Sequence, residues 1–120
     1  MTSKEKALEL AAEADAKKAL DIRVLDLRGV ASFTDFFVIA SGTSDRHART
    51  IADAVLEKAH RLEEQPLGVE GKELGRWILV DLGEVVLHIF QEEVRAYYDL
   101  ERLWGEATSV ELEHAAGGSR

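Results

Sequence analysis

The most constraining feature of this sequence is a run of five apolar residues, Phe36–Ala40, that ends at Ser41-Gly42. The run is too short for a helix and lacks the alternation of a half-exposed strand, so it predicts a strand that is buried on both faces. A strand of this kind needs packing layers on both sides of its sheet. The chain must therefore provide further strands and enough helices to cover them.

Helical periodicity appears on both sides of this run. Apolar residues spaced three and four apart predict a first helix over Lys4–Ala19 and a second that begins near Ser44 and ends before Gln65-Pro66. A third helix is expected over Gln91–Tyr98, and Asp99 can cap a further short turn, Leu100–Trp104. These segments can supply the covering layers.

Four further segments have strand character. Alternating or continuous apolar residues predict strands at Ile22–Leu27, Leu67–Gly71, Trp77–Leu82 and Val85–Phe90. The last two flank Gly83-Glu84 at the spacing of a hairpin, which requires an antiparallel pair and argues against an all-parallel dinucleotide-binding fold. We therefore expect an α/β (α+β mixed) fold, with a mixed five-stranded sheet flanked by helices.

Length and composition indicate one domain followed by a tail. The 120 residues, 46% of them hydrophobic, fit a single domain with its own core. We assign residues 1–104 to this domain and expect residues 105–120, which end in Gly117-Gly118-Ser119-Arg120, to be a disordered tail. No cysteine is present, and no apolar stretch suits a signal peptide or a membrane span. A cytoplasmic location without membrane association is therefore expected.

The net charge of -8 is concentrated in one part of the chain. Residues 1–62 carry ten acidic and ten basic residues, whereas residues 63–106 carry eleven acidic and four basic residues, a net of seven negative charges. Binding to nucleic acid needs positive charge that displaces counterions, so direct nucleic-acid recognition by this half is not expected. An acidic surface suits a basic protein partner, although acidity can also serve solubility alone.

Candidate catalytic residues do not form a recognised pattern. Ser41–Ser44 lies between a strand and a helix, where backbone N–H groups can hold a phosphate, but no Walker lysine follows and Asp45 would repel an anion. Three acidic residues, Asp26, Asp35 and Asp81, are scattered near strand ends rather than paired for two-metal catalysis. We therefore predict a protein without enzymatic activity, cofactor or metal.

Two histidines are better explained by structure than by chemistry. His88 is in phase with Val86 and Phe90 in its strand, so we expect it to be partly buried and hydrogen-bonded. His47 lies in the first turn of the second helix, where it either bonds the Ser41–Ser44 turn or lies at the surface. Their positions lack the i, i+4 spacing of a helical metal site.

Aromatic residues gather in the acidic half of the chain. In the strand that begins at Trp77, the side chains of Ile78, Val80 and Leu82 form an aliphatic face suited to the core. Trp77 and Asp81 are left on the other, more accessible face. Tryptophan and tyrosine rimmed by acidic residues are typical of interaction hot spots, although the domain's own helices can instead cover Trp77.

Four motifs in this chain resemble the ribosomal silencing factor (Iojap-related) family. They are DFFVIASGTSDRH at Asp35–His47, VEGK at Val69–Lys72, RWILVD at Arg76–Asp81 and YDLERLW at Tyr98–Trp104. The resemblance runs in unbroken order from Lys4 to Trp104.

The resemblance implies a fold, a partner and a mechanism. The fold is related to the nucleotidyltransferase fold but lacks its catalytic acids. The partner is the large ribosomal subunit, bound through its fourteenth protein, so that joining of the small subunit is sterically blocked and translation is repressed under nutrient limitation. The partner-binding residues carried over by position are Trp77, Asp81, Tyr98, Asp99, Leu100 and Glu101.

Two alternatives remain open at the level of sequence. A nucleotidyltransferase-like, nucleotide-binding enzyme would use Ser41-Gly42 to hold a phosphate. A homodimer of the free protein would act as a scaffold, and the sequence does not decide the oligomeric state.

Overall fold

The computed structural model describes residues 1–110, which form four helices and six strands. The helices are α1 (Ser3–Ala16), α2 (Asp45–Arg61), α3 (Glu92–Tyr98) and α4 (Leu100–Leu103). The strands are β1 (Leu20–Asp26), β2 (Phe36–Gly42), β3 (Gly68–Glu70), β4 (Trp77–Asp81), β5 (Val85–Gln91) and β6 (Thr108–Val110). Within these residues, no helix has both the length and the apolar character that crossing a membrane requires.

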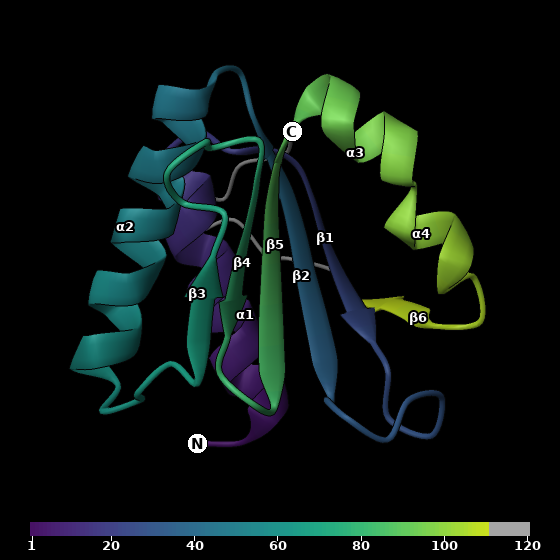
Figure 1. The fold of residues 1–120 in the computed structure, drawn as a ribbon. Coiled ribbons are helices and arrows are strands. Elements are labelled where there is room, and N and C mark those ends of the chain that lie inside the picture. The colour runs from purple at the N-terminus through teal and green to yellow at the C-terminus, as the bar shows by residue number, and fades with distance from the viewer. Residues whose placement is uncertain (111–120) are drawn as a thin grey trace.

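The six strands form one sheet in the order β3-β4-β5-β2-β1-β6. The two central strands, β2 and β5, run parallel, while every other neighbouring pair is antiparallel. β4 and β5 form the expected hairpin, in which Leu82 N–H donates to the Val85 carbonyl across Gly83-Glu84. The prediction of a mixed sheet flanked by helices is therefore confirmed (Figure 1).

The predicted number of strands, five, is wrong, because Thr108–Val110 forms a sixth. These residues pair antiparallel with Val24–Asp26 of β1. They lie in the segment 105–120, which its composition predicts to be a disordered tail; residues 111–120 of that segment lie outside the described residues. A three-residue strand that depends on a partner more than eighty positions away in the sequence has too little periodicity of its own to be predicted.

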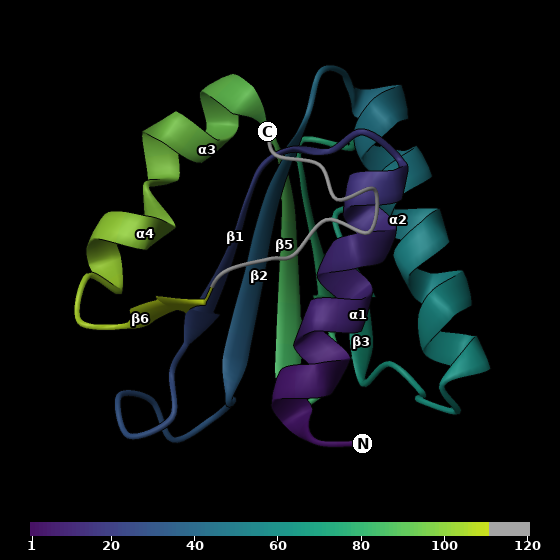
Figure 2. The same cartoon turned by 180° about the vertical axis from the view of Figure 1, so that it is seen from behind.

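Helices α1 and α2 pack together on one face of the sheet (Figures 1 and 2). α1 begins with a capping box, in which Thr2 Oγ1 accepts from Glu5 N–H and Glu5 Oε1 accepts from Thr2 N–H. The core beneath the two helices includes Ile78 and Val80 of β4, which are fully buried. The prediction that the aliphatic face of this strand faces the core is confirmed.

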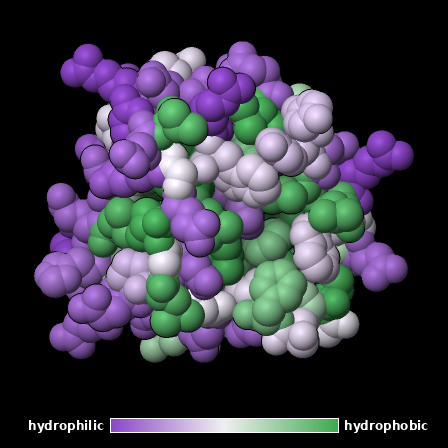
Figure 3. All heavy atoms as spheres, in the orientation of Figure 1, coloured by the Kyte–Doolittle hydropathy of each residue, from purple (hydrophilic) through white to green (hydrophobic). Residues whose placement is uncertain are grey.

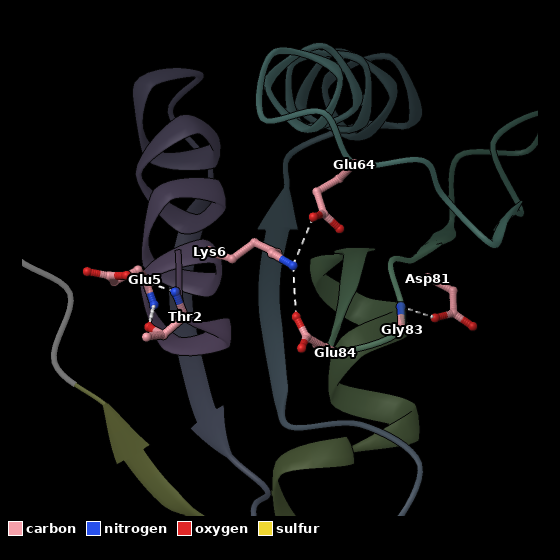
Figure 4. A network of polar contacts seen from close by, with 7 residues as sticks. All are labelled: Thr2, Glu5, Lys6, Glu64, Asp81, Gly83 and Glu84. Atoms are coloured by element: carbon pink, nitrogen blue, oxygen red, sulfur yellow. Dashed lines mark hydrogen bonds and ion pairs between the residues drawn. The ribbon is translucent and has the colours of Figure 1, made fainter.

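A buried cation ties α1 to two other parts of the fold (Figure 4). The Lys6 ammonium lies 2.8 Å from Glu84 Oε1 in the β4–β5 turn and 3.0 Å from Glu64 Oε2, just after α2. Burial alone would lower the pKa of Lys6, but the hydrogen bonds to Glu84 and Glu64 outweigh it and raise that pKa above its usual value. Lys6 therefore stays charged and joins three elements at one end of the sheet.

The opposite face of the sheet is covered only in part. A second core, built on Phe37, Ile39 and Phe90, packs against Val94 of α3 and, at its margin, against Leu100 of α4. In Figure 1 these two short helices lie over the β1 side of the sheet and leave most of β3 and β4 uncovered. Figure 3 shows apolar residues reaching the surface across the middle of this face, among hydrophilic margins. The incompletely covered face is where the candidate site lies.

Candidate partner-binding site

Trp77 is the first residue of β4 and lies on the incompletely covered face. Alternation along β4 buries Ile78 and Val80 and leaves Trp77, Leu79 and Asp81 partly exposed on the other side. The expectation that Trp77 and Asp81 share the more accessible face is confirmed. The domain's own helices therefore cover Trp77 only in part.

An aromatic cluster surrounds Trp77. Its ring centroid lies 4.9 Å from that of Phe90, which is fully buried, and 4.6 Å from that of Tyr98 on α3. Tyr98 in turn contacts Tyr97, with centroids 5.1 Å apart and ring planes at 89°. Tyr97 is 80% exposed and Tyr98 is 50% exposed. The cluster therefore runs continuously from the core to the surface.

The buried residue His88 supports this cluster from the core side. The indole Nε1–H of Trp77 donates a hydrogen bond of 3.1 Å to Nδ1 of His88. The His88 side chain is buried, and its ring meets that of Phe37 edge-on with centroids 4.5 Å apart. Burial lowers the pKa of His88 to about 4, so its ring is neutral near pH 7. The expected hydrogen bond of His88 is confirmed, but the residue is buried and not only partly so.

A hollow of about 570 Å³ opens beside Trp77. Its walls come from α3, from the start of β4 and from the loop between β3 and β4. The lining residues are Gly71, Leu74, Arg76, Trp77, Glu93, Val94, Tyr97 and Tyr98. Tyr97 and Leu74, which is 72% exposed, are not among the residues that the sequence predicts for the site. The only sequence signal for Leu74 was a large apolar residue inside a polar loop.

The β3–β4 loop that forms one wall is held from several sides. Gln91 Nε2 donates to the Gly75 carbonyl at 3.0 Å, and Arg49 Nη1 donates to the Glu73 carbonyl at 3.1 Å. Gly75 has a φ of +69°, and a Cβ there would lie 2.8 Å from the backbone oxygen of Asp45. The wall of the hollow is therefore fixed against the start of α2.

The segment Asp99–Glu101 follows the aromatic cluster directly. Asp99 stands at the N-cap of α4, as expected, but its side chain makes no capping hydrogen bond. It is exposed and has a left-handed backbone, with a φ of 50°. The left-handed turn separates α3 from α4 and lets Leu100 pack at the margin of the second core. Asp99 thus presents a carboxylate at the edge of the aromatic surface.

Glu101 is engaged inside the domain. Its Oε2 lies 2.7 Å from Nη2 of Arg95, a buried residue whose Nη1 also donates to Ser41 Oγ at 2.8 Å. Burial would raise the pKa of Glu101, but the hydrogen bonds and the charge of Arg95 outweigh it and hold that pKa below its usual value. Glu101 therefore fixes α4 against α3.

Asp81 lies apart from the other predicted site residues. It ends β4, four residues beyond Trp77, which places it about 13 Å away along the strand. Its Oδ1 accepts from Gly83 N–H at 2.9 Å and so stabilises the hairpin turn (Figure 4). The structure therefore brings together Trp77, Tyr98 and the segment that follows, but not Asp81.

The Ser41–His47 stretch is a closed structural junction. His47 Nδ1 accepts from Thr43 N–H at 2.9 Å, and Ser44 Oγ caps α2 by accepting from His47 N–H at 3.0 Å. The other ring nitrogen of His47 lies 2.9 Å from the Lys17 carbonyl and ties the junction to the end of α1. The N–H groups of Thr43 and His47, which could otherwise hold a phosphate, are therefore already hydrogen-bonded. Of the two roles expected for His47, the structure shows the bond to the turn.

The candidate acids do not gather at one point. Asp26 pairs with Arg28, whose hydrogen bond lowers the pKa of Asp26, and Asp81 serves the hairpin turn. Among residues 1–110, no group of three histidine, aspartate or glutamate side chains is placed to hold a metal ion. What this part of the chain does offer is a fixed aromatic surface beside a hollow.

Comparison with known proteins gives matches over the whole chain. Residues 1–120 match the family model RsfS, described as ribosomal silencing factor during starvation. The ribosomal silencing factor RsfS of Halalkalibacterium halodurans is 42% identical over 112 residues, which cover 92% of this chain and 96% of that protein. The similarity therefore extends well beyond the aromatic cluster.

Two further matches extend the comparison. A crystal structure of a Chromobacterium violaceum protein superposes with a TM-score of 0.86 at 32% identity, covering 99% of this chain and 100% of that one. The mouse protein named mitochondrial assembly of ribosomal large subunit protein 1 is 35% identical over 91 residues, which cover 73% of this chain and 40% of the mouse protein. The similarity thus includes both helix layers and the sheet.

Proposed function

Because this chain belongs to the ribosomal silencing factor (RsfS) family, we propose that it binds the large ribosomal subunit and prevents the small subunit from joining it. The contact on the ribosome is the fourteenth protein of the large subunit. Occupation of that position blocks joining sterically and so represses translation under nutrient limitation. Affinity and position are sufficient for this role, because no bond is made or broken.

The observation that carries this proposal is the surface formed by Trp77, Tyr97 and Tyr98. A tyrosine that is 80% exposed, next to a half-exposed tyrosine and a partly exposed tryptophan, leaves apolar ring surface in contact with water. Such aromatic residues, packed on a rigid base, are the usual anchors of protein interfaces. The name of the mouse relative, which refers to assembly of the ribosomal large subunit, supports the large subunit as the partner.

Charge supports a basic protein as the point of contact. Residues 63–106 carry seven net negative charges, and Glu92, Glu93 and Asp99 are exposed around the aromatic surface. Ribosomal RNA would be repelled by this potential, whereas a basic ribosomal protein would be attracted by it. Electrostatic attraction of this kind raises the association rate and helps to orient the encounter.

Co-sedimentation with isolated large subunits tests the proposal. The protein is expected to pellet with large subunits and to remain in the supernatant with small subunits. Binding should weaken as salt is raised, because exposed charges contribute to it. Absence of binding to large subunits at low salt would exclude the proposed function. Retained binding to large subunits that lack the fourteenth protein would exclude that protein as the point of contact.

A further inference from the structure

The bond between His88 and Trp77 follows from the register of the β4–β5 hairpin. Trp77 lies opposite Phe90, and Leu79 lies opposite His88, so the side chains of Trp77 and His88 are diagonal neighbours on the same face. This places Nδ1 of His88 3.1 Å from the indole nitrogen. Since the indole nitrogen is only a donor, His88 Nδ1 must be the unprotonated nitrogen. The neutral ring therefore carries its hydrogen on Nε2.

The second ring nitrogen of His88 is left without a partner. Within residues 1–110, no hydrogen-bonding group reaches His88 Nε2, which is fully buried. The ring is enclosed by aromatic side chains, with Phe37 edge-on at 4.5 Å and Phe90 nearly parallel at 6.2 Å. A buried polar atom without a partner costs free energy, and a leucine or phenylalanine here would avoid that cost. What histidine supplies, and an apolar residue cannot, is an acceptor for the Trp77 indole.

This bond decides which part of the indole a partner can meet. Trp77 lines the hollow, whereas His88 does not, so the N–H of the indole is directed away from the hollow and into the domain. Phe90 and Tyr98 contact the ring, and the hydrogen bond to His88 fixes its remaining rotation. A side chain that is already fixed in this way loses less conformational entropy when a partner binds.

We propose that His88 is a positioning residue for the partner-binding surface, holding the Trp77 indole with its N–H turned inward and its hydrocarbon surface turned toward the partner. This inference rests on the proposed function. It assigns a role to a residue that contacts no partner itself. It also predicts that the partner meets Trp77 through apolar contact and not through a hydrogen bond to the indole nitrogen.

A double-mutant cycle on large-subunit binding tests this role, with H88L, H88Q, W77F and the combination W77F/H88L. H88L removes the acceptor and should weaken binding about fivefold, the loss expected for one ordinary hydrogen bond. H88Q keeps an acceptor oxygen and should bind nearly as well as the wild type. In the W77F background, which lacks the indole N–H, H88L should have no further effect.

Hydrogen exchange of the Trp77 indole N–H in the free protein gives a second, independent test. The Trp77 indole N–H signal, told apart from that of Trp104 by comparison with W77F, should exchange slowly with solvent in the wild type and in H88Q. It should exchange at least tenfold faster in H88L, although that variant stays folded by circular dichroism. A histidine that does not bond the Trp77 indole in solution would leave exchange at this one group unchanged.

The outcomes separate this inference from the proposed function. If the wild type does not bind large subunits, the proposed function fails and the binding role of His88 fails with it. If the wild type binds and H88L binds equally well, only the inference is overturned. It is also overturned if H88L weakens binding to the same extent in the W77F background, because His88 would then act without Trp77.

Discussion

The ring centroids of Tyr98 and Trp77 lie 4.6 Å apart, so the last residue of α3 is packed against the first residue of β4. Neither residue is fully buried by this contact. The two rings therefore support each other at the surface, on a base formed by the buried Phe90 and His88.

Replacing both rings tests whether they anchor the partner. The double variant W77A/Y98A should weaken binding to large subunits by about 2–4 kcal/mol, the range found for aromatic hot spots. Isothermal titration or quantitative co-sedimentation measures the change. His60→Ala is the matched control, because His60 is exposed on α2, on the opposite side of the sheet. A folded double variant that binds like the wild type would show that the site is elsewhere.

The buried guanidinium of Arg95 should be needed for stability. It bonds both Ser41 and Glu101, so Arg95→Met leaves a partly buried carboxylate without its counter-charge. The free energy of unfolding in urea should fall by roughly 2 kcal/mol, below the value for a fully buried pair because the Glu101 side chain is 27% exposed. The combination R95M/E101L should recover part of the loss. A change under about 0.5 kcal/mol for R95M would contradict this account.

A side chain at Gly42 is expected to destabilise the protein. A Cβ at this position would lie 2.9 Å from the backbone nitrogen of Ala48, so β2 and α2 would have to move apart. Gly42→Ala should therefore destabilise the protein by about 1–3 kcal/mol, as overpacking does elsewhere. Gly68→Ala is the control, since a Cβ there meets nothing within 4 Å. Equal urea midpoints for the two variants would rule out the close approach.

His88 should make stability depend on pH in the acidic range. Its pKa is about 4 in the folded protein and near the ordinary 6.5 in the unfolded chain, so the unfolded chain binds the proton first as pH falls. The free energy of unfolding is therefore highest above pH 6.5, where His88 is neutral in both states. It falls as the pH is lowered toward 4, by about 3 kcal/mol at most. H88Q should lack this loss. Urea titrations from pH 7 to 4 compare the two proteins, and parallel curves would exclude the effect.

The parts of the fold that depend on patterns among neighbouring residues could be predicted from the sequence. The buried strand at Phe36–Ala40 follows from a continuous apolar run, and the hairpin follows from the two-residue spacing at Gly83-Glu84. The two faces of β4 follow from local alternation of apolar residues. The four motifs also identified the family correctly. β6 was missed because its three residues gain their structure from pairing with β1.

The candidate site could be predicted only in part, because it depends on contacts between distant segments. Nothing local in the sequence shows that the β3–β4 loop is held by Gln91 and Arg49, or that Leu74 therefore lines a hollow. The bond between Trp77 and His88 could have been predicted from the sequence. A two-residue turn at Gly83-Glu84 sets Trp77 opposite Phe90, which makes His88 its diagonal neighbour.

We propose that binding at this aromatic surface prevents the two ribosomal subunits from joining. Light scattering during the mixing of purified subunits measures joining directly. Large subunits incubated first with the wild-type protein should give a reduced signal, and W77A/Y98A should restore the signal at the same concentration. An undiminished signal with wild-type protein bound to every large subunit would contradict the claim.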